Sequence, residues 1–174
     1  MNESHVKFRT VTTRPSYVRA AGPLLAVITL LLWGDPASAA RNCRLTVTGI
    51  NFATYTPGQA TPVNATGNVN MRCRGKPNAG QPPVYVLSLS AGNSGSYSPR
   101  RMQKAPGTTL NYNVYIDPLY GTVWGDGSPG TSVIQQTFTT KQYDADHPAY
   151  GQVNASQDPE PGYYSDNLIV TLIF

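Results

Sequence analysis

The chain has 174 residues, with 13 lysines and arginines against nine aspartates and glutamates, a formal net charge of +4. This length is enough for one domain. The basic residues form no dense patch, so the composition gives no support for nucleic-acid binding. The 16 glycines and 15 prolines exceed the usual share and leave little room for long helices.

The first 40 residues have the three parts of a secretory leader. Four basic residues precede the apolar run LLAVITLLLW (24–33), and the small residues ASAA (37–40) follow it. This order is typical of a signal peptide. A run of ten residues is too short to cross the ~30 Å hydrocarbon core, which disfavours a membrane anchor. We therefore expect residues 1–40 to direct export to the periplasm and then to the cell surface or the extracellular medium, with cleavage after Ala39 or Ala40.

The part after the leader carries the only two cysteines, Cys43 and Cys73. Removing 40 residues leaves 134, with nine basic and seven acidic residues, so part of the positive charge belongs to the leader. In an exported chain one cysteine pair predicts a disulfide, here closing a loop of about 30 residues. The alternative is a zinc site, which is disfavoured because this part has a single histidine, His147.

Short segments with apolar residues at every second position follow one another after residue 41. The segment 43–47 puts Cys43 on the inward face, and 67–73 does the same for Cys73, so a bridge between these two strands is geometrically reasonable. We expect further strands at 84–90, 110–116, 133–140 and 167–174, and turns at 76–83, 91–100, 117–130 and 158–162. Short strands with frequent turns predict an all-β sandwich or barrel, as one domain over residues 41–174.

Residues suited to catalysis or metal binding are few and scattered. His147 lies in YDADHPAYG beside a proline, where an exposed loop histidine is expected, and the aspartates lie in or beside turns. The segment DADH (144–147) has too few ligands for an EF-hand loop, and no spacing points to a pair of acids for glycoside hydrolysis. Arg100-Arg101 is interpreted as a solvated pair after a turn rather than an anion site. We therefore expect no enzyme, no catalytic residue, no metal and no cofactor.

Several stretches in a fixed order carry a family resemblance. They are CRLTVTGINFATY, VNMRC, VYVLSLSAGNSGSYSPRRM, LNYNVYIDPLYGTVWGDG, YGQV and GYYSDNLIVTLIF. This ordered set, which runs from Cys43 to Phe174, resembles the spore coat protein U family, the secreted pilus subunits of the archaic chaperone–usher pathway. One departure is Phe52-Ala53, where the family commonly has Phe-Gly.

The resemblance implies an immunoglobulin-like two-sheet sandwich that lacks its last strand and is completed by a strand from a partner. In such subunits a groove between the first and final strands is filled by a periplasmic chaperone and then by the amino-terminal segment of a neighbouring subunit, with an outer-membrane usher as a further partner. The resemblance implies an acceptor groove lined by Leu45, Val47, Leu168, Val170, Leu172 and Phe174.

The residue pattern at the carboxyl end agrees with an open edge. NLIVTLIF (167–174) is apolar on both faces and lacks the lysine, proline or bulge that usually protects an edge strand. The alternative is a central strand whose two neighbours both come from earlier in the chain.

Subunits of this family that polymerise carry a donor segment ahead of the first strand. With cleavage after Ala40 only Arg41 and Asn42 precede Cys43, and two residues span under ~7 Å. We therefore expect a subunit that accepts a strand but gives none, at the tip or end of a pilus, with a role in adhesion or biofilm and a surface receptor or glycan as partner. The alternative is a single-domain coat or carbohydrate-binding secreted module with a self-complete sandwich.

Overall fold

The computed structural model describes residues 4–13, 42–75, 84–104, 107–137 and 140–174. These residues form ten strands and no helix, so none of them belongs to a helix that could cross a membrane. The apolar run 24–33, the expected cleavage site and the expected turn at 76–83 lie outside the described residues. The all-β class predicted from the sequence is confirmed.

The strands in chain order are β1 (Ser4–Thr13), β2 (Asn42–Thr48), β3 (Ile50–Phe52), β4 (Val63–Arg74), β5 (Val84–Leu89), β6 (Arg100–Lys104), β7 (Thr108–Tyr115), β8 (Ile134–Thr137), β9 (Gln142–Val153) and β10 (Tyr164–Ile173).

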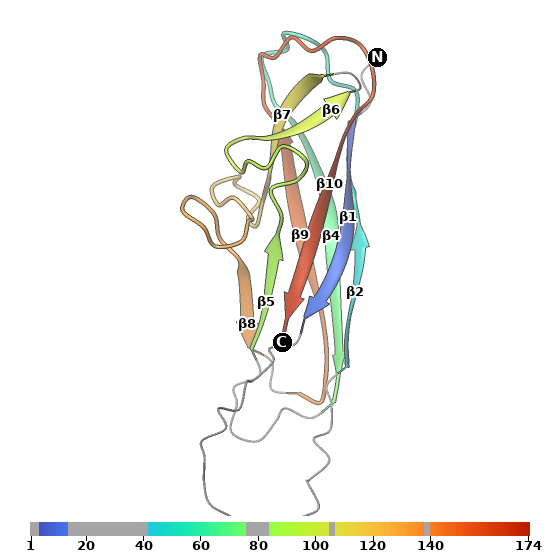
Figure 1. Ribbon diagram of the computed structural model, residues 1–174, viewed down its shortest axis with the longest axis vertical. Helices are drawn as coiled ribbons and strands as arrows, with labels where there is room; N and C mark the ends of the chain where they lie inside the picture. The colour runs from blue at the N-terminus through green and yellow to red at the C-terminus, as the bar shows by residue number, and fades with distance from the viewer. Residues whose placement is uncertain (1–3, 14–41, 76–83, 105–106, 138–139) are drawn as a thin grey trace, which may run out of the picture.

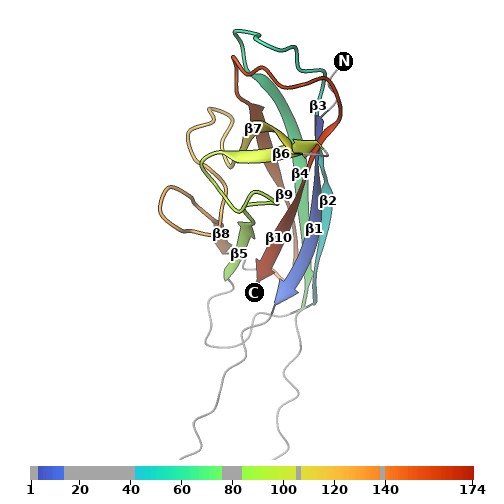
Figure 2. The same ribbon diagram turned by 45° about the horizontal axis from the view of Figure 1, so that its top comes forward.

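The strands pack as a sandwich whose sheet nearly closes on itself (Figure 1; Figure 2). Hydrogen-bonded neighbours follow the order β2, β4, β9, β7, β6, β10, β1, β3, and β5 pairs with both β10 and β8. The two ends of this order, β2 and β3, are consecutive in the chain and are separated only by Gly49. The arrangement is that of an immunoglobulin-like sandwich.

Alternation along the strands produces one continuous core. Every second residue is buried along 67–73 and 84–90 and from Leu110 to Val114, as are Leu168, Val170 and Leu172 of β10, whereas Ile116 is half-buried. Cys43 of β2 lies opposite Cys73 of β4 in register, and the two form the predicted disulfide.

Four strands were not expected from the sequence: β1, β3, β6 and β9. The strand β6 begins at the end of the expected turn 91–100, and β9 runs through YDADHPAYG, which was expected to be a loop. His147 is therefore a buried strand residue, and the prediction of an exposed loop histidine is wrong. The sequence did not show the apolar alternation of a strand here, because the inward residues of β9 include His147, Ala149 and Gly151, and none of these is strongly apolar.

A fully buried arginine, Arg100, ties several loops together. Its guanidinium donates hydrogen bonds to the carbonyl oxygens of Ser90 (2.8 Å) and Trp124 (2.6 Å) and to Oδ1 of Asn113 (2.6 Å). It also lies 4.8 Å from the ring centroid of Tyr97. Burial lowers the pKa of Arg100 from its usual value, while nearby tyrosines and aspartates oppose that change. The prediction of a solvated pair is therefore wrong for Arg100, which is buried and bound to other residues of the protein. Its neighbour Arg101 is exposed, as predicted.

A second buried polar residue, Asp166, fixes the start of β10. Its carboxylate accepts hydrogen bonds from the hydroxyl of Tyr112 (2.7 Å) and the backbone N–H of Asn93 (2.8 Å). Burial, followed by the charge of Asp166, raises the pKa of Tyr112 well above its usual value, so this phenol stays a donor. Gly92, with φ of +76°, packs so closely against the carboxylate that a Cβ has no room. The Asp166 contact with Tyr112 holds β10 against β7, and the Arg100 contact with Asn113 holds β6 against β7.

Arg100→Met should lower the free energy of unfolding of the full chain by about 3–5 kcal/mol, because it removes a buried charge and takes the guanidinium donors from the carbonyl oxygens of Ser90 and Trp124 and from Oδ1 of Asn113. The adjacent exposed Arg101→Met is the matched control and should change it by no more than ~0.5 kcal/mol. Urea denaturation measures both. Equal, small effects at the two positions would contradict the role assigned to Arg100.

Replacing Cys43 and Cys73 together by alanine should lower the free energy of unfolding by about 3–4 kcal/mol, because the bridge closes a loop of 30 residues. A reducing agent should destabilise the natural chain by a similar amount and leave the double variant unchanged. The comparison of the two chains in urea with and without reductant checks this expectation.

Candidate functional site

The edge of β10 is the feature that sequence reasoning singled out. Along its carboxyl half β10 pairs with β5 on one side, from Val170 opposite Leu89 to Ile173 opposite Val86. Its other side pairs with β1, in parallel, over ten residues from Ser4 opposite Tyr164 to Thr13 opposite Ile173. We call the position between β10 and β3, which β1 fills, the strand site.

The strand site joins the two ends of the sheet. On its far side β1 pairs antiparallel with β3, with Ser4 opposite Phe52 and Val6 opposite Ile50. None of the strands described between residues 42 and 174 lies between β10 and β3. Over the described residues, closure of the sandwich therefore depends on residues 4–13.

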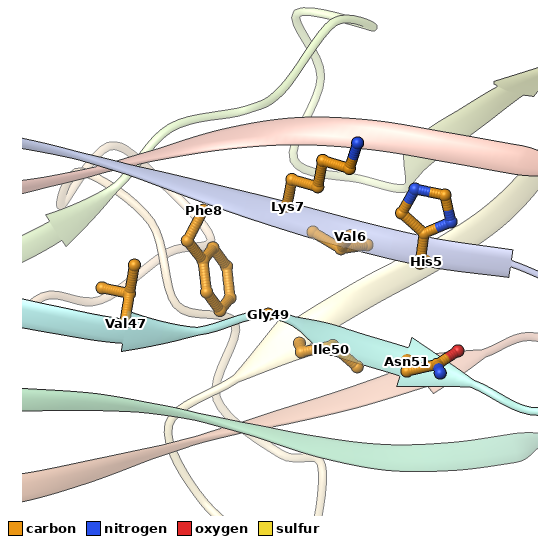
Figure 3. Close-up of a pocket in the computed structure, with 8 residues that line it drawn as sticks. All are labelled: His5, Val6, Lys7, Phe8, Val47, Gly49, Ile50 and Asn51. Atoms are coloured by element: carbon orange, nitrogen blue, oxygen red, sulfur yellow. The ribbon is translucent and has the colours of Figure 1, made fainter.

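The side chains of β1 that pack against the domain lie in its first half. Ser4 and Val6 are buried, Phe8 is half-buried against the core, and Arg9 to Thr13 are exposed. Figure 3 shows Phe8 pointing from β1 toward β2 on the side of Val47, while Lys7 points away. A hollow of about 400 Å³ lies beside these residues, between β1 and the β2–β3 segment.

The six residues predicted to line the groove lie on the two expected strands, with different relations to the strand site. Leu168, Val170 and Leu172 are buried on β10, and β1 runs in register beside them. Phe174 follows β10 and is half-buried against the core.

On the other strand, Val47 is half-buried and lines the hollow beside β1. Leu45 is half-buried against the core but does not line that hollow. These two residues therefore differ, since only Val47 is brought to the strand site.

Sequence reasoning missed the residues on the β3 side of the site, which are Gly49, Ile50 and Phe52. Ile50 and Phe52 are buried beside the start of β1. The alternation of Ile50 and Phe52 after a glycine was visible in GINF, although three residues are too short a run to predict a strand. The alternation of Val6 and Phe8 was equally visible, but those residues were assigned to the leader.

His147 lies in a cluster of polar side chains in which Tyr85 is buried and Gln136 is exposed. Its Nε2 is 3.0 Å from the hydroxyl of Tyr85, which also donates to Oε1 of Gln136 (2.8 Å). Burial lowers the pKa of His147, although the adjacent Asp146 opposes this, and burial raises the pKa of Tyr85. A neutral imidazole and a protonated phenol suit a structural hydrogen-bond cluster.

The aspartates of DADH lie on a strand face rather than in a loop. Asp144 accepts from Asn70 (2.8 Å) and pairs with Arg72 (2.6 Å), and Asp146 accepts from Asn68 (2.6 Å). Hydrogen bonds, first from Asn70 and then from Arg72, lower the pKa of Asp144. Within the part of the chain that the structure describes, no group of three or more histidine, cysteine or acidic side chains is placed to hold a metal ion.

The comparisons with known proteins bear on the whole fold. A family model described as Spore Coat Protein U domain matches residues 29–171, which is most of the chain. A search of curated proteins finds no match. The matched range spans β2 to nearly the end of β10, including both walls of the strand site and the disulfide. The chain belongs to the Spore Coat Protein U domain family.

Proposed function

We propose that this chain is a secreted structural subunit of a chaperone–usher surface pilus, without catalytic activity, that accepts a partner's strand at the strand site. The family is associated with pili of this kind. The observation that carries the proposal is the source of the strand between β10 and β3. That strand comes from residues 4–13, inside the segment expected to be removed on export.

Removal of residues 1–40 has a defined physical consequence for the rest of the domain. The N–H and C=O groups on one side of β10 and on one side of β3 lose their partners, and Ile50 and Phe52 lose their neighbours Val6 and Ser4. An apolar sheet edge of this kind is a template for strand addition. The partners we propose are a periplasmic chaperone first and a neighbouring pilus subunit afterwards, with an outer-membrane usher at the assembly site.

The position at the tip or end of the fibre follows from the expected cleavage site. The strand β2 begins at Asn42, so cleavage after Ala40 leaves one residue ahead of it. Such a subunit accepts a strand and has none to give. Adhesion or a role in biofilm, with a surface receptor or glycan as ligand, suits a subunit at that position.

The second candidate is a coat or carbohydrate-binding module with a self-complete sandwich. It is favoured by the filled strand site, which closes the sandwich whenever residues 4–13 are retained. A polar hollow on the outer face, lined by Arg44, Thr46, Asn70, Arg72 and Asp146, offers side chains of the kind that bind sugars. Binding of glycans by an isolated, stable monomer would favour this candidate.

Amino-terminal sequencing of the exported protein should give a start at Ala40 or Arg41. A start far enough upstream to keep an alternating segment would contradict the terminal position, because the subunit would then have a strand to donate. The same measurement on cells with export blocked should give the uncut chain as the control.

The exported chain should accumulate as soluble protein only when a chaperone from the same host is produced with it, because the open edge of β10 favours aggregation. The yield of soluble protein in periplasmic extracts, with and without that chaperone, measures this dependence. A good yield of stable cleaved monomer without the chaperone would contradict acceptance of a partner's strand.

A further inference from the structure

The fit of β1 to its site is more specific than simple apolar cover. Ten consecutive residues stay in register with β10, and the first three of them also pair with β3. The buried positions take a small residue, Ser4, and an aliphatic one, Val6, and the half-buried position takes an aromatic one, Phe8. The hydroxyl of Ser4 donates a long hydrogen bond of 3.5 Å to the carbonyl oxygen of Phe52.

The charges of the segment do not oppose docking. His5, Lys7 and Arg9 alternate with Ser4, Val6 and Phe8, and the exposed Lys7 and Arg9 lie on the outward side of the strand. The same residues therefore supply positive charge for a leader and an apolar face for a strand.

On the β2–β3 side of the strand site, the backbone of β1 passes so close to Gly49 that a side chain there would clash with it. A Cβ at residue 49 would lie 2.5 Å from the carbonyl oxygen of Val6, a distance that real Cβ atoms essentially never show. The absence of a side chain at Gly49 thus leaves room for the backbone of β1.

The connection between β1 and β2 also suits docking within one chain. The strand β1 ends, and β2 begins, at the same end of the sandwich (Figure 1). A tethered strand has an effective concentration on the order of 1 mM. A free strand of equal affinity, present at about 1 μM, is then at a ~1000-fold disadvantage.

We propose that the segment Ser4–Thr13 is a built-in ligand of the strand site, which keeps the site closed to partner strands until the leader is cut off. The inference rests on the proposed function, because it identifies what holds the acceptor site before a partner does. In this arrangement an uncut chain that folds is excluded from the fibre, and cleavage both releases the domain and opens its acceptor site.

The test compares two valines of β1 in the full, uncut chain. Val6 is 1 % exposed and Val11 is 44 % exposed, so Val6→Asp should release β1 while the matched control Val11→Asp should not. Hydrogen exchange of the backbone amides of β10 is the first readout. We expect faster exchange in Val6→Asp at the amides that face β1 and exchange like the natural chain in Val11→Asp.

The second readout is uptake of a fluorescently labelled peptide, SHVKFRTVTT, measured by anisotropy. We expect the Val6→Asp chain to bind it at least 100-fold more tightly than the natural uncut chain, and the peptide to restore the slow exchange of β10. In the Val6→Asp chain, a second substitution Gly49→Ala should prevent the peptide from restoring slow exchange. The control Gly121→Ala, where a Cβ would meet its nearest neighbour at an ordinary 3.7 Å, should leave that restoration intact.

The outcomes separate this inference from the proposed function. Equal uptake of the peptide by the natural and Val6→Asp chains would overturn the built-in ligand and leave acceptance of a partner's strand standing. Slow exchange of β10 in Val6→Asp without any peptide would overturn both, because the edge would then need no strand. Failure of the peptide to restore protection, or dimers in which β1 enters a second copy, would also overturn the assignment.

Discussion

Everything in this fold depends on the pairing of one strand, β10. Its inward residues fill the centre of the core and its other neighbours, β5 and β6, take only one of its edges. The remaining edge must be paired, since unpaired N–H and C=O groups beside apolar surface cost free energy and attract other strands. A strand placed there also joins β3 and nearly closes the sheet. The need for a strand at that edge is thus a property of the domain.

The buried polar contacts explain why such widely separated stretches of sequence carry the family resemblance. Arg100 binds Ser90 and Trp124, and Asp166 binds Tyr112 and the N–H of Asn93. These residues come from three of the stretches, and they meet in one region behind β10. Each buried polar group there needs its partner, so the stretches are constrained together. That region holds β10 in the position from which its edge faces the strand site.

Strong alternation of apolar residues predicted most of the sandwich, and weaker alternation hid the rest. The strands that carry Met71, Leu87 or Leu110 were evident because every second side chain is apolar. The strand β9 was not evident, since its inward side chains include His147 and Gly151 and its centre holds a proline.

Pro148 is tolerated in β9 because β7 pairs with β9 only from Tyr150 onward, so among the described strands none pairs with that side of β9 at the proline. Arg100 was misjudged for a related reason. A buried arginine needs acceptors from distant loops, and no local pattern reveals them. Weak apolar alternation limited the prediction at β9, and contacts with distant acceptors limited it at Arg100.

The amino-terminal segment satisfies the sequence requirements of a leader and those of a β-strand at the same time. A leader needs positive charge near its start, and an incoming strand needs one apolar face. Charge at every second residue meets both demands, because Lys7 and Arg9 stay in solvent while Val6 and Phe8 face the core. Sequence reasoning assigned the segment to the first pattern alone, since only the folded domain shows what the alternate face contacts. A cut between this segment and β2 would remove one strand from a sheet that needs it.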